Sequence, residues 1–153
     1  MKHTLIFNQA LNAPLDVVWA FFTNPYNLSK ITPKNMRFEI KTIGLGSTIS
    51  KGTIIDYVVT PFFDIPLKWR TEITEVMTNR VFADKQIKGP YKFWLHTHTF
   101  TVSNGSILME DKIEYELPFS PLTDKLIGST IHHRLQQIFS YRKEILDQIF
   151  NQH

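Results

Sequence analysis

The chain has 153 residues and a formal net charge of +3, and 42% of its residues are hydrophobic, 13% aromatic and 20% charged. This composition is that of a globular protein rather than a disordered or fibrous one, and we expect residues 1–153 to form a single domain. The absence of cysteine excludes disulfides and thiol catalysis, and the absence of any run of basic residues argues against nucleic-acid binding.

The amino-terminal segment MKHTLIFNQALN is too short and too polar for a secretory signal, because Asn8 and Gln9 interrupt its apolar residues. No other segment approaches the roughly 18 apolar residues that a membrane-spanning helix needs. We therefore expect a cytoplasmic protein without an integral membrane segment.

The first part of the chain predicts one strand followed by two short helices. Residues 3–11 alternate as a strand does. Proline at a first helical position is favoured, so a helix is expected to begin at Pro14 and to run to Phe22. A second short helix is expected from Pro25, after an asparagine N-cap, and Pro33 ends it.

Residues 36–118 are rich in β-branched and aromatic residues, with turn signals at the spacing of an antiparallel meander. We expect six strands here, near 36–43, 52–60, 67–77, 80–87, 92–103 and 106–117. The apolar segment 61–66 is expected to be a hairpin loop. Its Phe62 and Phe63 have four open roles: a pocket lid, a dimer contact, a membrane-touching edge, or packing back on the core.

The segment after Ser120-Pro121 predicts one long amphipathic helix. Its apolar stripe is expected to contain Ile127, Ile131, Leu135, Ile138, Arg142, Ile145 and Ile149. About 30 residues would span roughly 45 Å, which is enough to cross a whole sheet. The element order predicts an α+β fold, in which a seven-stranded curved antiparallel sheet holds this helix on its concave face and leaves a cavity between them.

The dipeptide Asn104-Gly105 lies between two alternating runs, a strong signal for a two-residue type I′ hairpin. This turn pairs Ser103 with Ser106 and so determines the register of the two strands. Residues directly opposite each other share one face of a sheet. The inner face then carries Trp94, His96, His98 and Phe100 opposite Tyr115, Ile113, Asp111 and Met109.

This register places His98 opposite Asp111 inside an apolar concavity. Burying either polar group alone would cost about 1–3 kcal/mol, so we predict that the two form a contact. Three roles are open for the pair: fixing the register, anchoring a ligand, or acting as an acid/base dyad. His96 and His98 with Asp111 could also begin a metal site, but no other ligand pattern supports one, and we predict neither a metal nor a cofactor.

Five further residues stand out. Trp69 is expected to face inward beside Tyr57 of the preceding strand, and filling the core is the favoured role for each of them taken alone. Asp84 and Gln86 share one face of their strand and are expected at the pocket rim. Arg134 lies near the apolar stripe of the long helix and could reach a buried acid, but a surface arginine with a buried aliphatic stem is the favoured interpretation.

Three segments carry a resemblance to known proteins: PLDVVWAFFTNPYNL, FADKQIKGPYKFWLHTHTF and DKIEYELPFSPL. Together with the element order they resemble the SRPBCC superfamily, which includes START domains, Bet v 1-like (birch-pollen-allergen-like) proteins and polyketide cyclases. They look most like its bacterial single-domain branch. The resemblance implies a helix-grip fold with a deep apolar pocket. It implies no particular reaction, since members bind lipids, quinones, hormones or polyketides and others catalyse cyclisation.

We therefore expect a carrier or sensor for a small hydrophobic or aromatic molecule of lipid, quinone or polyketide type, acting as a monomer or homodimer. No catalytic residue is assigned. Two alternatives stay open: a cyclase or dehydratase that uses His98 as a general base oriented by Asp111, and a protein-interaction module carried by Phe62 and Phe63. The predicted ligand-binding residues are Tyr57, Trp69, Trp94, His96, His98, Phe100, Asp111 and Tyr115.

Overall fold

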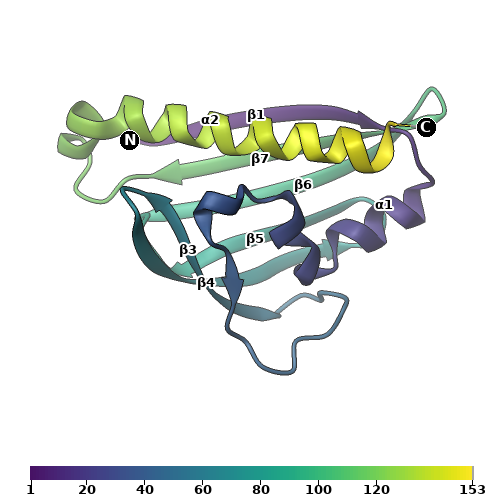
Figure 1. Cartoon of the computed structure of the whole chain (residues 1–153), viewed down its shortest axis with the longest axis horizontal. Coiled ribbons are helices and arrows are strands. Elements are labelled where there is room, and N and C mark those ends of the chain that lie inside the picture. The colour runs from purple at the N-terminus through teal and green to yellow at the C-terminus, as the bar shows by residue number, and fades with distance from the viewer. Residues whose placement is uncertain (153) are drawn as a thin grey trace.

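The computed structural model describes residues 1–152 and shows a long helix lying across a curved sheet (Figure 1). The strands are β1 (Lys2–Leu11), β2 (Glu39–Ile40), β3 (Ile54–Phe62), β4 (Ile65–Met77), β5 (Val81–Lys88), β6 (Phe93–Ser103) and β7 (Ser106–Glu116). The helices are α1 (Leu15–Phe22), the 3₁₀ helices η1 (Pro25–Ile31) and η2 (Lys34–Met36), and α2 (Leu122–Phe150).

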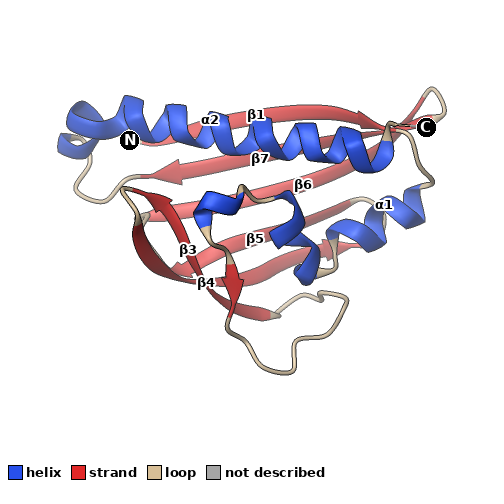
Figure 2. Cartoon of the chain, viewed as in Figure 1, coloured by secondary structure: helices blue, strands red, loops and turns tan. Residues whose placement is uncertain are grey.

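All neighbouring strands are antiparallel, in the order β1-β7-β6-β5-β4-β3-β2. The helices gather on one face of this sheet, and α2 runs close to β1 and β7 (Figure 2). The predicted α+β helix-grip fold is therefore confirmed. Among residues 1–152, no helix combines the length and the hydropathy that a membrane crossing needs.

The second predicted strand, at 36–43, is reduced to the two residues of β2. Lys34–Met36 forms η2 instead, which ends at Arg37 in the left-handed conformation (φ 49°). The second short helix is also of the 3₁₀ type, although Asn24 caps it as expected by accepting a hydrogen bond from the Tyr26 N–H at 3.1 Å. Short segments rich in Asn, Ser and Pro favour such tight turns over α-helix.

The predicted loop at 61–66 is much shorter in the structure. Phe62 pairs with Ile65, and the turn consists only of Phe63 and Asp64, both at positive φ (54° and 55°). Phe62 packs against the core, whereas Phe63 is 71% exposed. The sequence carries no signal for this turn, since bulky residues rarely adopt the left-handed conformation.

The buried stripe of α2 differs from the predicted one in its second half. Ile131, Leu135 and Arg142 are buried as expected, but Phe139, Leu146 and Phe150 replace Ile138, Ile145 and Ile149 in the fully buried set. Ile127, which was predicted at the start of the stripe, is exposed. Each of the three replaced residues precedes an apolar neighbour in the sequence, so the helical period permits either choice, and only packing on the sheet selects one.

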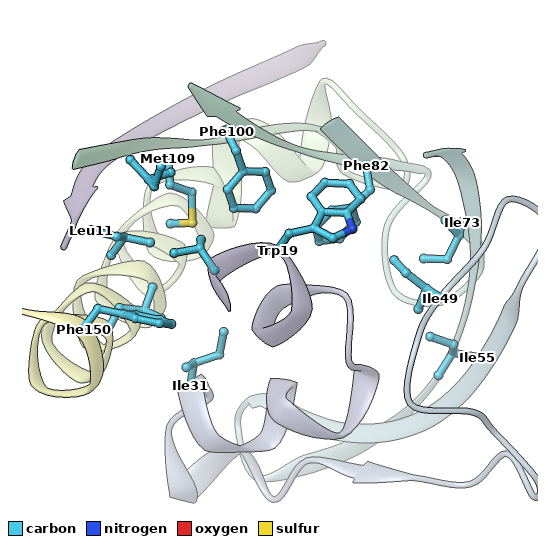
Figure 3. Close-up of a cluster of buried hydrophobic side chains, with 13 residues drawn as sticks. Leu11, Trp19, Ile31, Ile49, Ile55, Ile73, Phe82, Phe100, Met109 and Phe150 are labelled. Atoms are coloured by element: carbon cyan, nitrogen blue, oxygen red, sulfur yellow. The ribbon is translucent and has the colours of Figure 1, made fainter. Parts of the chain in front are cut away.

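The wedge between α1 and the sheet is filled by aromatic rings (Figure 3). Trp19 meets Phe82 and Phe100 edge to face, with ring centroids 5.8 and 5.6 Å apart. Such geometry is the favoured one for aromatic pairs. Phe82 is buried in this packing, and the ring of His98 stacks on it at 4.1 Å.

The β6–β7 hairpin has the predicted register, from Ser103 opposite Ser106 to Trp94 opposite Tyr115. Asn104 and Gly105 both have positive φ, 49° and 78°, as a type I′ turn requires.

Replacing Gly105 with alanine is expected to destabilise the protein by about 1 kcal/mol, because an L-residue is strained in the left-handed conformation. Gly128→Ala, in the middle of α2, is the matched control. Its new Cβ would meet its nearest neighbour at an ordinary 3.8 Å, and alanine favours a helix by about 1 kcal/mol. Urea denaturation measures the free energy of unfolding of both variants. Changes of the same sign in the two variants would contradict the assignment of the turn.

Candidate functional site

A cavity of about 180 Å³ lies between the concave face of the sheet, the 3₁₀ helices and α2. Roughly 150 Å³ holds a benzene molecule, so this space suits a small ring system. Aliphatic and aromatic side chains make most of its wall. On the sheet side they include Ile55, Tyr57, Val59, Trp69, Ile73, Phe82, Tyr91 and Trp94, and on the helix side Leu28, Ile31, Leu135, Ile138 and Phe139.

The structure divides the eight predicted site residues into two groups. Tyr57, Trp69, Trp94, His96 and His98 line the cavity. The other three are buried behind its wall: Phe100 packs on Trp19 and Phe22, Asp111 lies beneath the two histidines, and Tyr115 packs between His3 and Tyr91. The position of α2 explains this division, because the helix covers the β1 and β7 side of the sheet and leaves the cavity over β3 to β6.

One wall of the cavity is a continuous set of aromatic rings. Tyr57 and Trp69 are directly paired across β3 and β4, and their rings stack at 5.7 Å, as the sequence suggests. Trp69 meets Trp94 edge to face at 5.3 Å. Tyr91, which the sequence reasoning missed, contacts both tryptophans, at 5.7 and 4.8 Å.

The side chain of Gln86 holds Tyr91 in this wall. Its amide donates to the Tyr91 carbonyl at 2.7 Å and accepts from the Tyr91 N–H at 3.2 Å. The turn passes so close that a Cβ on Gly89 would lie 2.5 Å from Gln86 Oε1, so a larger residue there would have to displace the Gln86 side chain. Gln86 therefore has a positioning role behind the cavity, whereas Asp84 of the same strand lines the cavity itself.

A buried polar cluster forms the side of the cavity at β6, the strand that carries His96 and His98. His96 Nε2 donates to Asp111 Oδ1 at 2.8 Å. His98 Nε2 faces Asp84 Oδ2 at 3.2 Å. His98 Nδ1 lies 3.0 Å from Asp111 Oδ1, but the angle is too bent for a hydrogen bond. The predicted contact between His98 and Asp111 is therefore present, while the hydrogen bond to Asp111 comes from His96.

The two histidines differ in charge. Each ring nitrogen of His98 faces a carboxylate oxygen, and only the imidazolium carries a proton on both nitrogens. Burial lowers the pKa of His98, but the carboxylates of Asp111 and Asp84 outweigh burial and raise it overall. Burial and the neighbouring charge of His98 lower the pKa of His96 to about 4. We therefore assign a cation at His98 and a neutral imidazole at His96.

Arg142 of α2 completes the cluster. Its side chain is almost fully buried, with Nη1 3.5 Å from Asp111 Oδ1 and the guanidinium 5.1 Å above the Phe139 ring. Burial alone would raise the pKa of Asp111, but the charge of Arg142, the hydrogen bond from His96 and the nearby imidazole of His98 hold it well below its usual value. The sequence reasoning placed Arg142 in the apolar stripe of the helix without giving it a role, although a charged residue inside such a stripe was the signal.

Arg134, two turns earlier on α2, lies elsewhere. Its Nε donates to the Pro61 carbonyl at 3.0 Å, and its Nη2 donates to Asn35 Oδ1 at 3.4 Å. It therefore ties α2 to the end of β3 rather than reaching a buried acid.

Among residues 1–152, the group that could hold a metal ion consists of Asp84, His96 and His98, whose ligand atoms lie within 4.8 Å of one another. Asp111 is not one of them. An ion here would displace the proton that His98 shares with Asp84, and it would lie in the same cluster as the Arg142 cation. The hydrogen bonds already account for this grouping, so the arrangement favours a proton-bearing cluster over a metal centre.

A family model described as "Polyketide cyclase / dehydrase and lipid transport" matches residues 11–138. The fold is also shared with solved structures. These include a protein from Thermus thermophilus, TTHA0849, with a TM-score of 0.73, 14% identity and 95% of each chain covered. Norcoclaurine synthase from Thalictrum flavum has a TM-score of 0.70 and 16% identity, over 100% of this chain and 88% of that one.

Ginseng major latex-like protein 151 from Panax ginseng has a TM-score of 0.59 and 15% identity, over 89% of this chain and 96% of that one. At such identities the likeness shows the fold alone. No curated protein matches the sequence.

Proposed function

Because the chain belongs to the polyketide cyclase/dehydrase and lipid transport family of SRPBCC proteins, we propose that it binds a small hydrophobic or aromatic molecule of lipid, quinone or polyketide type. The observation that carries this proposal is the cavity of about 180 Å³, walled by aromatic rings and bordered on one side by a buried polar cluster. In this proposal the protein acts as a carrier or sensor in the cytoplasm.

The chemistry of the wall supports a ligand with rings. Trp69, Trp94, Tyr57 and Tyr91 offer both ring faces and ring edges, and aromatic rings favour stacked and edge-to-face contacts with other rings. Ligand pockets of this kind are mostly apolar and use a few polar groups to orient the ligand.

Filling the cavity tests the proposal. Ile138 lines the cavity from α2, and Ile138→Trp is expected to weaken binding of 2-naphthol at least about tenfold by occupying its space. Fluorescence titration of 2-naphthol measures the affinity, and thermal unfolding confirms that the variant is folded. Ile149→Trp is the control, because Ile149 is on the same helix, 43% exposed and outside the cavity. Equal affinity in both variants would contradict binding in this cavity.

A second candidate function, proton-transfer catalysis of the cyclase or dehydratase type, is favoured by one observation. Neutral His96 lies on the cavity wall, and its Nε2–H is oriented by Asp111. In this candidate His96 rather than His98 is the general base, since His98 already carries a proton between two carboxylates. Turnover of a polyketide-like ketone that survives His96→Gln would exclude this role.

A further inference from the structure

We infer that the molecule bound in this cavity is uncharged and carries a carbonyl oxygen that accepts hydrogen bonds from the guanidinium of Arg142. This inference rests on the proposed binding function and adds the chemical class of the ligand: a small cyclic ketone, quinone or lactone rather than a hydrocarbon or a carboxylic acid.

Arg142 lacks the hydrogen bonds that a buried guanidinium needs. It is only 7% exposed and lines the cavity. Its Nη1 is buried without a hydrogen-bond partner among residues 1–152. Its contact with Asp111, at 3.5 Å, is an ion pair only. Buried donors are almost always paired, so this group requires an acceptor from outside the described chain.

Trp69 provides a second, independent case of an unpartnered hydrogen-bond donor in the cavity wall. The residue is only 8% exposed, and it lines the same cavity. Its indole Nε1–H is buried without a partner among the described residues. Both unpartnered groups can only donate hydrogen bonds. An occupant that satisfies them must therefore supply oxygen or nitrogen acceptors, which a hydrocarbon does not have.

The charges of the cluster favour a neutral occupant. Asp84 and Asp111 contribute two negative charges, and Arg142 and the doubly flanked imidazolium of His98 contribute two positive charges. The cluster is therefore balanced before a ligand enters. A carboxylate ligand would add a third negative charge near two buried carboxylates, where charges of like sign repel strongly. A carbonyl oxygen accepts the same hydrogen bonds without that repulsion.

Two bicyclic probes that differ by one oxygen test the inference. Isothermal titration calorimetry is expected to show 1-tetralone binding at least about tenfold tighter than tetralin, because a hydrogen bond from a charged donor has that effect on affinity. In Arg142→Met, which keeps an unbranched apolar stem but ends short of the guanidinium and has no donor, this ratio is expected to fall toward one. Arg134→Met is the matched control and should keep the wild-type ratio, since Arg134 itself does not line the cavity and its Nε is already bonded to the Pro61 carbonyl.

The infrared carbonyl stretch of 1-tetralone bound to the wild-type protein provides a measurement that needs no variant. It should lie at a lower wavenumber than in hexane, and an unshifted stretch would overturn the inference even if Arg142→Met does not fold.

Equal binding of 1-tetralone and tetralin would also overturn the inference while supporting the proposed binding function. Tighter binding of tetralin-1-carboxylate than of 1-tetralone would overturn the neutral class of ligand. If neither 1-tetralone nor tetralin binds, both the inference and the proposed binding function are overturned.

Discussion

Replacing Asp111 with asparagine is expected to lower the free energy of unfolding by about 3–5 kcal/mol. Asp111 is almost fully buried, and its Oδ1 faces nitrogens of His96, His98 and Arg142 at 2.8, 3.0 and 3.5 Å. Asparagine has nearly the same shape but no charge. The variant therefore leaves two buried cations with Asp84 as their remaining counter-charge, and uncompensated buried charge is strongly destabilising.

Urea denaturation at pH 7 measures this loss. Asp56→Asn is the matched control, because Asp56 also pairs with an arginine, Arg70, at 2.7 Å, but on the solvent side of the sheet. Exposed ion pairs contribute little, so the control should change stability hardly at all. A similarly small effect of Asp111→Asn would show that the cluster is not the buried charge network described above.

Replacing His96 with glutamine is expected to remove most of the acid sensitivity of the protein between pH 6.5 and pH 4. In the unfolded chain His96 takes up a proton near pH 6.5, but its pKa in the folded state is about 4. The unfolded state then binds more protons in this window, so stability falls as the pH falls, by roughly 3 kcal/mol in total. Glutamine still carries a donor for Asp111 and does not titrate.

The neighbouring histidine has the opposite pH dependence. The pKa of His98 is raised by Asp111 and Asp84 against the effect of burial. Its stabilising contribution is therefore complete below pH 6.5 and is lost as the pH rises through its folded pKa. Asp111 and Asp84 have lowered pKa values, so their contributions are lost only when the pH falls below about 4.

Denaturation curves from pH 4.5 to pH 8.5 separate these effects. His96→Gln should flatten the acid side alone, and His98→Gln should flatten the alkaline side. His133→Gln, on the exposed face of α2, controls for the loss of one imidazole. An acid slope in His96→Gln equal to that of the unchanged protein would refute the assignment of His96 as the neutral member of the pair.

Local signals in the sequence were enough to predict much of the fold. Asn104-Gly105 requires positive φ at two successive residues, so one dipeptide established the register of β6 and β7 and placed both histidines on the inner face. Elements with weak local signals were predicted less well. β2 is only two residues long, and the turn at Phe63-Asp64 uses residues that rarely adopt its conformation.

The sequence by itself determined the order of the elements, the inner face of the β6–β7 hairpin and the presence of a carboxylate opposite His98, because alternation and turn geometry act between near neighbours. Only the tertiary structure decided which inner residues reach the cavity and which lie behind it, and that Asp84 and Arg142 join the histidines. Asp84 comes from a strand whose register has shifts, and Arg142 from a helix whose rotation depends on packing. Both depend on contacts between distant parts of the chain, which no local pattern records.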